Sequence, residues 1–318
     1  MNKIVFLDAS TVNLDGDVDF YNLEAIGDLE DYPNTKSEEE IIRRAEKADA
    51  IVVNKTVISR SIFEALPQLK HISIVATGYN NIDLEAATDH NVTVSNVQGY
   101  AKDCVPQYVF AMMLNFAVKL NNYNRDVKNG DWQKSGFFAL LRYPTFELAG
   151  KTIGVVGYGA IGKGVVRIAK AFGMKVLVNT ASGQSDDETD IVSIDQVYDK
   201  SDFVVLCCPL NESNYHMIDN RVLHKMKSNA YLINAGRGGL VNAKDLADAL
   251  NNGVIAGAGV DVLETEPPTK DPLLEDVKNL VITPHTAWAT VESRQRLIDE
   301  VALNIADCLN GGKRNVVN

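Results

Sequence analysis

Residues 154–180, GVVGYGAIGKGVVRIAKAFGMKVLVNT, combine a strand-like run, a glycine-rich turn and a helical pattern in close succession. Gly157, Gly159 and Gly162 form a GxGxxG pattern after the apolar run TIGVV. In this context the first glycine permits a tight turn, the second lets the backbone approach a pyrophosphate, and the third lets helix and strand pack closely. The start of the helix adds backbone amides and a positive dipole end. The segment therefore predicts a dinucleotide-binding βαβ unit.

Strand-like runs alternate with helical patterns along the rest of the 318-residue chain, which predicts α/β domains with parallel sheets. KIVFLDA, AIVVN, HISIVAT and NVTVSNV are strand-like runs within residues 1–100. Residues 101–288 hold about six more strands, the size of a full dinucleotide-binding domain. The amphipathic helix in residues 289–318 is expected to cross back to the first domain. The sequence thus predicts two Rossmann-like, doubly wound parallel-sheet domains, the substrate-binding one discontinuous, with a cleft between them.

The net charge of -11 and the pI near 5.0 argue against nucleic acid and anionic membrane surfaces as partners. MNKIVFLDAS leads directly into a strand, which predicts that there is no signal peptide. No apolar run reaches the roughly 18 residues that a membrane span needs. The four cysteines match no zinc or redox spacing, and no histidine has metal-ligand spacing, so we expect a cytoplasmic protein without a metal.

The choice of coenzyme depends on the residue about 20 positions beyond the glycines, where an acid normally binds the ribose 2′-hydroxyl. That position is Thr180. Thr180 and Ser182 can hydrogen-bond a 2′-phosphate, but TASGQSDD supplies no Arg or Lys to neutralise one, and it adds Asp186 and Asp187. The sequence therefore leaves both NAD and NADP open.

Three candidate catalytic residues follow three successive strands of the second domain. NAGRGG carries Arg237, DVLETEPP carries Glu266, and TPHTAW carries His285. Each alone is more typical of a surface or packing role. Because the carboxyl ends of parallel strands meet at the edge where ligands bind, the three together indicate an active site.

The chain resembles the D-isomer-specific 2-hydroxyacid dehydrogenases along essentially its whole length. The matching segments are ATGYNNID, VPQY, LAGKTIGVVGYGAIG, NAGRGG, VDVLETEPP and TPHTAWAT. Within that family it is most similar to the glycerate dehydrogenases, or hydroxypyruvate reductases, through GDWQKSGFF, the Trp288 of HTAWAT, and RQRLIDEVALNI.

The resemblance implies a role for each matched position. Arg237 anchors the substrate carboxylate and polarises its keto oxygen, Glu266 pairs with the catalytic histidine, and His285 exchanges the proton. The substrate contacts expected are Thr77, Gly78 and Asn80, with Trp288 either lining the substrate pocket or packing at an interface. The cofactor contacts expected are Val105, Gly157, Gly159, Ala160, Ile161, Gly162, Thr180, Cys208, Pro209, Ala235 and Asp261.

The function expected is transfer of a hydride from NAD(P)H to a small 2-keto acid, giving D-glycerate from hydroxypyruvate or glycolate from glyoxylate. The alternatives are a D-lactate-type reductase of broad 2-keto acid specificity and a nucleotide-sensing binding protein like the co-repressors of this family. A homodimer is expected, because the apolar residues 104–127, predicted as one helix, and the aromatic segment 132–146 are more hydrophobic than a monomer surface normally is. His71, His90, His216 and His224 are assigned structural or solvent-exposed roles.

Overall fold

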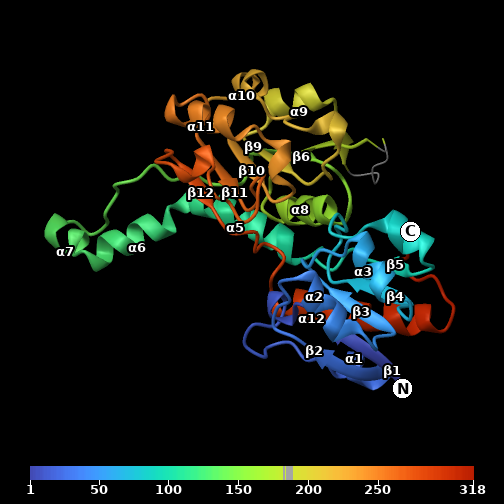
Figure 1. The fold of residues 1–318 in the computed structure, drawn as a ribbon. Helices are drawn as coiled ribbons and strands as arrows, with labels where there is room; N and C mark the ends of the chain where they lie inside the picture. Colours follow the sequence, from blue (N-terminus) through green and yellow to red (C-terminus); the bar gives the residue numbers. More distant parts are fainter. Residues whose placement is uncertain (182, 184–188) are drawn as a thin grey trace. The chain divides into compact units, whose positions relative to one another are not determined.

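The structure is a computed structural model that describes residues 1–181, 183 and 189–318, and it divides the chain into two units (Figure 1). Unit 1 consists of Met1–Ala101 and Trp288–Asn318, so it contains both ends of the chain. Unit 2 consists of Lys102–Ala287. Among the described residues, no helix combines the length and the apolar character that crossing a bilayer requires.

Unit 1 is built on a five-stranded sheet in the order β2-β1-β3-β4-β5, with every neighbouring pair parallel. Its strands are β1 (Asn2–Phe6), β2 (Gly27–Asp31), β3 (Ala50–Val53), β4 (His71–Ile74) and β5 (Thr93–Ser95). Its helices are η1 (Ala9–Thr11), α1 (Tyr21–Ile26), α2 (Glu38–Ala45), α3 (Arg60–Ala65), α4 (Leu84–Asp89) and α12 (Val291–Leu309).

Helices cover both faces of this sheet because two separate apolar clusters form on its two sides. One cluster joins the sheet to α2, α3 and α4, and includes the fully buried Phe63. The other joins the sheet to α1 and α12, and includes the fully buried Leu297 and Val301. The C-terminal helix thus completes the core of unit 1.

Unit 2 holds a seven-stranded parallel sheet in the order β12-β11-β10-β9-β6-β7-β8. Its strands are β6 (Thr152–Val156), β7 (Lys175–Asn179), β8 (Asp190–Ile191), β9 (Phe203–Leu206), β10 (Tyr231–Asn234), β11 (Gly257–Val260) and β12 (Leu280–Ile282). Its helices are α5 (Cys104–Val118), α6 (Leu120–Lys128), α7 (Asp131–Ser135), α8 (Ala160–Ala171), α9 (Ile194–Lys200), η2 (Glu212–Asn214), α10 (Asn220–Lys225), η3 (Gly238–Leu240), α11 (Ala243–Asn251) and η4 (Pro272–Leu274).

The sheet of unit 2 is also covered on both faces, by α5 and α8 on one side and by α9, α10 and α11 on the other (Figure 1). Helices α5 and α8 pack closely at Gly164, where a Cβ atom would lie 2.6 Å from the Pro106 ring. The predicted fold class, two parallel sheets each wrapped by helices, is confirmed.

The prediction of a single helix over residues 104–127 is wrong. The structure has two helices, α5 and α6, separated at Lys119, whose φ is +54°. Helix α5 carries nine buried residues against the core of unit 2, whereas only Asp126 is buried in α6. The break lies where the apolar run gives way to the polar segment 119–126, because α6 has no core to pack against.

Candidate active site

The residues predicted to contact the cofactor gather at the carboxyl edge of the sheet in unit 2 and at two helix starts. They follow β6 (Gly157), β7 (Thr180), β9 (Cys208 and Pro209), β10 (Ala235) and β11 (Asp261), begin α8 (Gly159, Ala160, Ile161 and Gly162), or lie in the first turn of α5 (Val105). The strand order reverses between β6 and β9, which is where such folds bind ligands. A Cβ atom on Gly157 would lie 2.7 Å from the backbone nitrogen of Cys208, so the two loops are in contact at this switch point.

The three glycines of the turn after β6 serve three different geometric needs. Gly157 has a φ of +100°, which side-chain-bearing residues rarely adopt, and a Cβ atom on Gly162 would collide with the carbonyl oxygen of Gly157. Apart from its own chain neighbours, no described residue has an atom within 4 Å of the Cβ position of Gly159, the residue just before the twelve-residue helix α8. An open, uncharged surface beside the first amides of a helix fits a pyrophosphate. The residues present therefore fit a dinucleotide.

Thr180 follows β7 directly and lies beside this turn, because the Gly157 N–H donates to the carbonyl oxygen of Asn179 at 2.8 Å. The Asn179 side chain donates to the Val192 carbonyl at 3.0 Å and thereby joins β7 to the chain that follows β8. Ser182, Asp186 and Asp187, which also bear on the choice of coenzyme, lie outside the described residues.

His285 and Glu266 form a direct pair. The Nδ1 atom of His285 lies 2.5 Å from Oε2 of Glu266, and Oε1 of the same carboxylate accepts the Leu263 N–H at 2.9 Å. An ionised carboxylate has no proton to donate, so His285 must carry its proton on Nδ1 in this bond. Nε2 is then the ring nitrogen that can exchange a proton with another molecule. The two side chains are 32% and 34% exposed, which leaves the pair accessible.

Asp261 holds the loop in which His285 lies. Its side chain is 1% exposed and accepts hydrogen bonds from the Thr283 hydroxyl at 2.6 Å, the Thr286 N–H at 3.0 Å and the Ala287 N–H at 2.8 Å. The His285 N–H donates to the Asp261 carbonyl at 2.7 Å. These bonds support the φ of +55° at His285, an uncommon conformation that surrounding contacts must maintain. The described hydrogen bonds of the Asp261 side chain are all with this loop, whereas its backbone N–H donates to the Asn234 carbonyl at 2.9 Å.

Arg237 lies in the turn after β10, exposed, with its guanidinium donating to the Gly236 carbonyl at 2.8 Å. The turn is shaped by Asn234, a residue that the sequence reading did not single out. Buried to 1% exposure, Asn234 donates to the Arg237 carbonyl at 2.9 Å and accepts the Gly236 N–H at 3.1 Å. Its place as the first residue of NAGRGG was the available signal, since an Asn at a strand end often organises the next turn.

The remaining predicted substrate residues belong to unit 1. Thr77, Gly78 and Asn80 follow β4, and the Thr77 hydroxyl donates to the Val97 carbonyl at 2.8 Å. No described backbone group accepts a hydrogen bond from the N–H of Gly78 or Asn80. Trp288 packs edge-on against Tyr100, with ring centroids 6.2 Å apart, and borders the core beneath α12.

A further set of contacts in unit 2 was not predicted from the sequence. Tyr215 and His216 both contact Glu264, the other glutamate of VLETEPP. Nothing in the sequence links NYH with that loop, because 48 residues separate His216 from Glu264. Within the described part of the chain, no group of three or more His, Cys, Asp or Glu side chains is arranged to hold a metal ion.

Comparison with known protein families identifies the family of this chain. Residues 110–287, more than half of the chain, match the family model for the NAD-binding domain of D-isomer-specific 2-hydroxyacid dehydrogenases. The chain belongs to this family. The dehydrogenase is 37% identical to a hydroxypyruvate reductase of Blautia hydrogenotrophica, covering 99% of both chains. It is 38% identical to a glycerate dehydrogenase of Methylorubrum extorquens, covering 99% of this chain and 98% of the relative.

A solved structure supports the same fold. An acyclic imino acid reductase, Bsp5, in complex with NADPH and D-Arg, superposes with a TM-score of 0.85 at 30% identity, over 99% of this chain and 100% of that one. The dehydrogenase is therefore an NAD(P)-dependent enzyme of the 2-keto acid and D-2-hydroxy acid class, and the family predicted from the sequence is confirmed.

Proposed function

We propose that the dehydrogenase reduces hydroxypyruvate to D-glycerate, and glyoxylate to glycolate, at a site that includes Arg237, Glu266 and His285. The observation that carries the proposal is the 2.5 Å pair of His285 and Glu266 at the carboxyl edge of the parallel sheet that fits a dinucleotide. The names of the two relatives, hydroxypyruvate reductase and glycerate dehydrogenase, support this substrate class.

Reduction of a keto group needs a hydride on carbon and a proton on oxygen. When bound, a reduced nicotinamide supplies the hydride. We propose that His285, protonated at Nε2, donates the proton to the keto oxygen as negative charge develops there. Glu266 accepts a hydrogen bond from Nδ1–H, which fixes the ring orientation and leaves Nε2 for the proton transfer.

Arg237 has a different proposed role. Its guanidinium is planar, permanently charged and able to pair with a carboxylate through two parallel hydrogen bonds. We propose that it anchors the substrate carboxylate and stabilises the developing oxyanion, with Thr77, Gly78 and Asn80 contributing further carboxylate contacts. The backbone N–H groups of Gly78 and Asn80, which donate to no described backbone acceptor, support that assignment.

We also propose that discrimination between NADH and NADPH is weak. Thr180 is neutral, so it neither repels a 2′-phosphate nor binds a ribose diol as a carboxylate does. We expect kcat/KM for the two coenzymes to differ by less than about tenfold, and Thr180→Asp to favour NADH by about tenfold or more. An unchanged coenzyme ratio in Thr180→Asp would place the discriminating contact elsewhere.

The experiment that tests the proposed function is a matrix of NADH and NADPH against hydroxypyruvate, glyoxylate, pyruvate and phenylpyruvate. We expect the highest kcat/KM with hydroxypyruvate or glyoxylate. The highest value with pyruvate or phenylpyruvate would instead indicate a D-lactate-type or broad reductase. Coenzyme binding without turnover of any of the four would indicate the nucleotide-sensing alternative.

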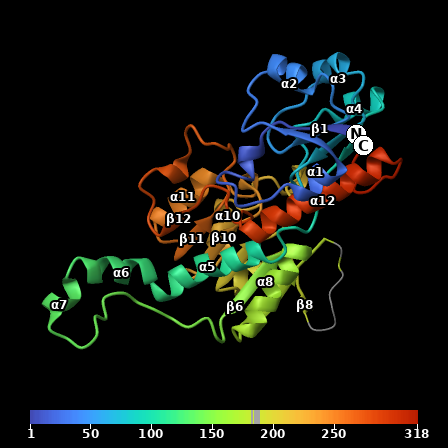
Figure 2. The ribbon, with the colours of Figure 1, turned by 90° about the horizontal axis from the view of Figure 1, so that it is seen from below.

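We propose that two copies of the chain associate through the α6–α7 region of unit 2. Both views show α6 and α7 extending away from the sheet of that unit (Figures 1 and 2). The segment after α7 exposes Phe137 at 75%, Phe138 at 97% and Leu141 at 91%. Because monomeric proteins rarely leave such a cluster in water, a second copy burying the same residues is the self-complementary solution.

Light scattering tests the association. The wild type is expected at twice the chain mass of 34.8 kDa, and a double variant, Phe138→Ser with Leu141→Ser, at the mass of one chain. Leu14→Ser is the matched control, because Leu14 is 76% exposed but lies in unit 1. A monomeric wild type would contradict the proposal.

A further inference from the structure

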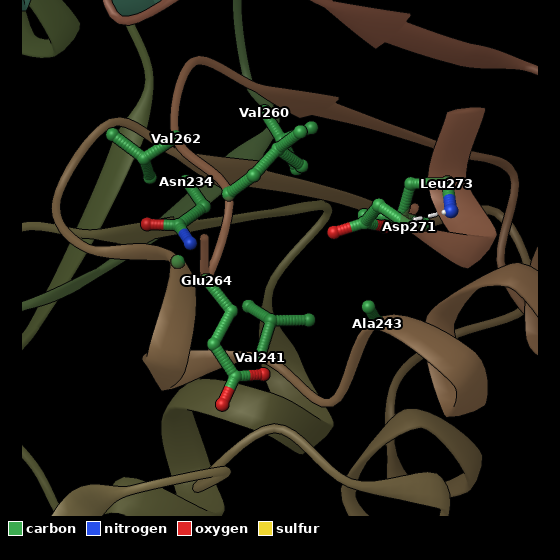
Figure 3. Close-up of a pocket in the computed structure, with 10 residues that line it drawn as sticks. Asn234, Val241, Ala243, Val260, Val262, Glu264, Asp271 and Leu273 are labelled. Atoms are coloured by element: carbon green, nitrogen blue, oxygen red, sulfur yellow. Dashed lines mark hydrogen bonds between the residues drawn. The ribbon is translucent and has the colours of Figure 1, made fainter. Parts of the chain in front are cut away.

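The loop after β11 carries two glutamates that contact different partners. Glu266 pairs with His285, whereas Glu264 accepts the Tyr215 hydroxyl on Oε1 and places Oε2 3.2 Å from His216 Nε2. Figure 3 shows the Glu264 side chain extending from the loop away from Val260 and Val262. The Tyr215 and His216 rings stack with centroids 3.9 Å apart, so the two partners form one surface facing Glu264.

The segment that supplies Tyr215 and His216 is fixed to the turn that carries Arg237. The His216 N–H donates to the Gly239 carbonyl at 2.8 Å, and the Ile218 N–H donates to the Leu240 carbonyl at 3.0 Å. Ile218 and Val241 form a parallel bridge just beyond. The segment with Tyr215 and His216 is therefore held by backbone hydrogen bonds to the residues that follow Arg237.

Direct packing also holds the same loop, since its Val262 and Leu263 are buried. A Cβ atom on Gly238 would collide with the backbone of Leu263 and Glu264, so the Arg237 turn and the loop touch there. Beside this contact is a cavity of about 10 Å³, lined by Val241, Ala243 and Leu273 among others, which is room for about one water (Figure 3). It is far too small for a coenzyme or a keto acid. The hydrogen bonds of Glu264 to Tyr215 and His216 add a further point of attachment.

We propose that Glu264, through Tyr215 and His216, positions the loop that presents Glu266 to His285. Glu264 is a positioning residue, because its described contacts are with Tyr215 and His216 and its effect passes through the backbone to Glu266, two residues on. Oε1 of Glu266 accepts the Leu263 N–H, which ties Glu266 to the backbone just before Glu264. The proposal rests on the catalytic role proposed for Glu266.

The chemistry of the cluster suits a fixed anchor. The hydrogen bond from Tyr215 holds the pKa of Glu264 below its usual range, and the same bond raises the pKa of the Tyr215 hydroxyl. Glu264 therefore stays ionised and Tyr215 stays protonated at neutral pH. Hydrogen bonds to an ionised acceptor are shorter and stronger than neutral ones.

The test compares kcat with KM in a set of variants. Glu264→Ala is expected to lower kcat about tenfold, because a small displacement of a catalytic group has effects of this size. KM for the coenzyme should stay within about twofold, since the glycine turn is untouched. Glu264→Gln keeps the shape and an acceptor for Tyr215, so it should restore kcat to within about threefold of wild type.

Two further variants separate positioning from general damage. Tyr215→Phe removes one bond of the same chain of contacts, so the Glu264→Ala/Tyr215→Phe double variant should be no slower than Glu264→Ala alone. Glu38→Ala is the matched control, because Glu38 is an exposed carboxylate in unit 1 that accepts two hydroxyls, from Ser59 and Ser61. It should leave kcat unchanged. A wild-type kcat in Glu264→Ala, no restoration by Gln, or additive losses in the double variant would overturn the proposal.

A readout without substrate keeps this test independent of the proposed function. Amide hydrogen exchange of a peptide covering residues 262–266 should be faster in Glu264→Ala than in wild type or Glu38→Ala. Unchanged exchange would overturn the positioning role even if hydroxypyruvate proves to be the substrate. Faster exchange in a protein that does not reduce hydroxypyruvate would support the positioning of the loop while rejecting the proposed function.

Discussion

The two histidine–glutamate pairs of the loop after β11 have the same composition but different geometry. In the pair of Glu266 and His285, the carboxylate contacts Nδ1 at 2.5 Å. In the pair of Glu264 and His216, the carboxylate contacts Nε2 at 3.2 Å and shares its other oxygen with the Tyr215 hydroxyl. Only the first pair leaves an Nε2 available for proton transfer. The two pairs therefore differ in which ring nitrogen the carboxylate engages, in line with the catalytic role proposed for the first and the positioning role proposed for the second.

The largest difference in activity between the two pairs is expected when each histidine is replaced by asparagine. His285→Asn removes the proposed proton donor and should lower kcat/KM for hydroxypyruvate by about 10²–10⁴-fold at pH 7. His216→Asn should cost only a few-fold, roughly what one hydrogen bond contributes. Asn is the suitable replacement because both histidines have positive φ, 55° and 51°, which Asn tolerates. Equal losses in steady-state assays of the two variants would contradict the division of roles.

A third histidine, His71, contrasts with the two pairs because the partners of its ring nitrogens are hydroxyl groups. His71 is fully buried in β4, with ring nitrogens 2.8 Å from Thr93 Oγ1 and 3.0 Å from Ser95 Oγ, and burial lowers its pKa to about 4. As the pH falls below 6.5, His71 takes up a proton in the unfolded chain but stays neutral in the folded chain. The contribution of neutral His71 to the free energy of unfolding is therefore fully present above pH 6.5 and is lost as the pH falls toward 4. The decline amounts to roughly 3 kcal/mol.

Chemical denaturation at pH 7 and pH 4.5 measures this effect. The wild type should lose more unfolding free energy than His71→Asn does over the same interval. Equal losses would show that another group is responsible.

A substitution at Gly238 should disturb both pairs at once. In Gly238→Ala the new Cβ must displace the backbone of Leu263 and Glu264, and overpacking of this kind costs about 1–3 kcal/mol. We expect a lower thermal midpoint together with a lower kcat. A variant with lower stability but wild-type kcat would show that the loop can move without affecting Glu266.

The sequence predicts the fold class well because two local patterns carry it. Alternating strands and helices indicate parallel sheets, and the glycine turn after β6 indicates where a dinucleotide fits; both sheets were found. Strand β2 was missed because GDLED is acidic and lies at the edge of its sheet, where little apolar pattern is required. The interruption at Lys119 was missed because the end of the apolar run does not by itself show that a helix stops, and a lysine gives no signal for a left-handed φ.

In the candidate active site, too, some features could be predicted from the sequence and others could not. That Glu266 lies beside His285 could be predicted, since both follow neighbouring strands of one sheet. The function of Glu264 could not, because its partners come from a loop far away in the sequence. The buried Asp261 shows a further limit: the sequence places it at the sheet edge, and only the structure shows that it organises the His285 loop.

The most direct test of proton donation by His285, tuned by Glu266, is the pH profile of kcat/KM for 2-keto acid reduction in wild type, Glu266→Gln and Glu264→Gln. If Glu266 assists proton donation as proposed, loss of its charge should move the alkaline limb to lower pH, because a carboxylate beside a positive charge stabilises that charge. Glu264→Gln, which leaves His285 and its partner in place, should keep the limb where it is in wild type. An alkaline limb that stays in place in Glu266→Gln would contradict the pairing of these two residues in catalysis.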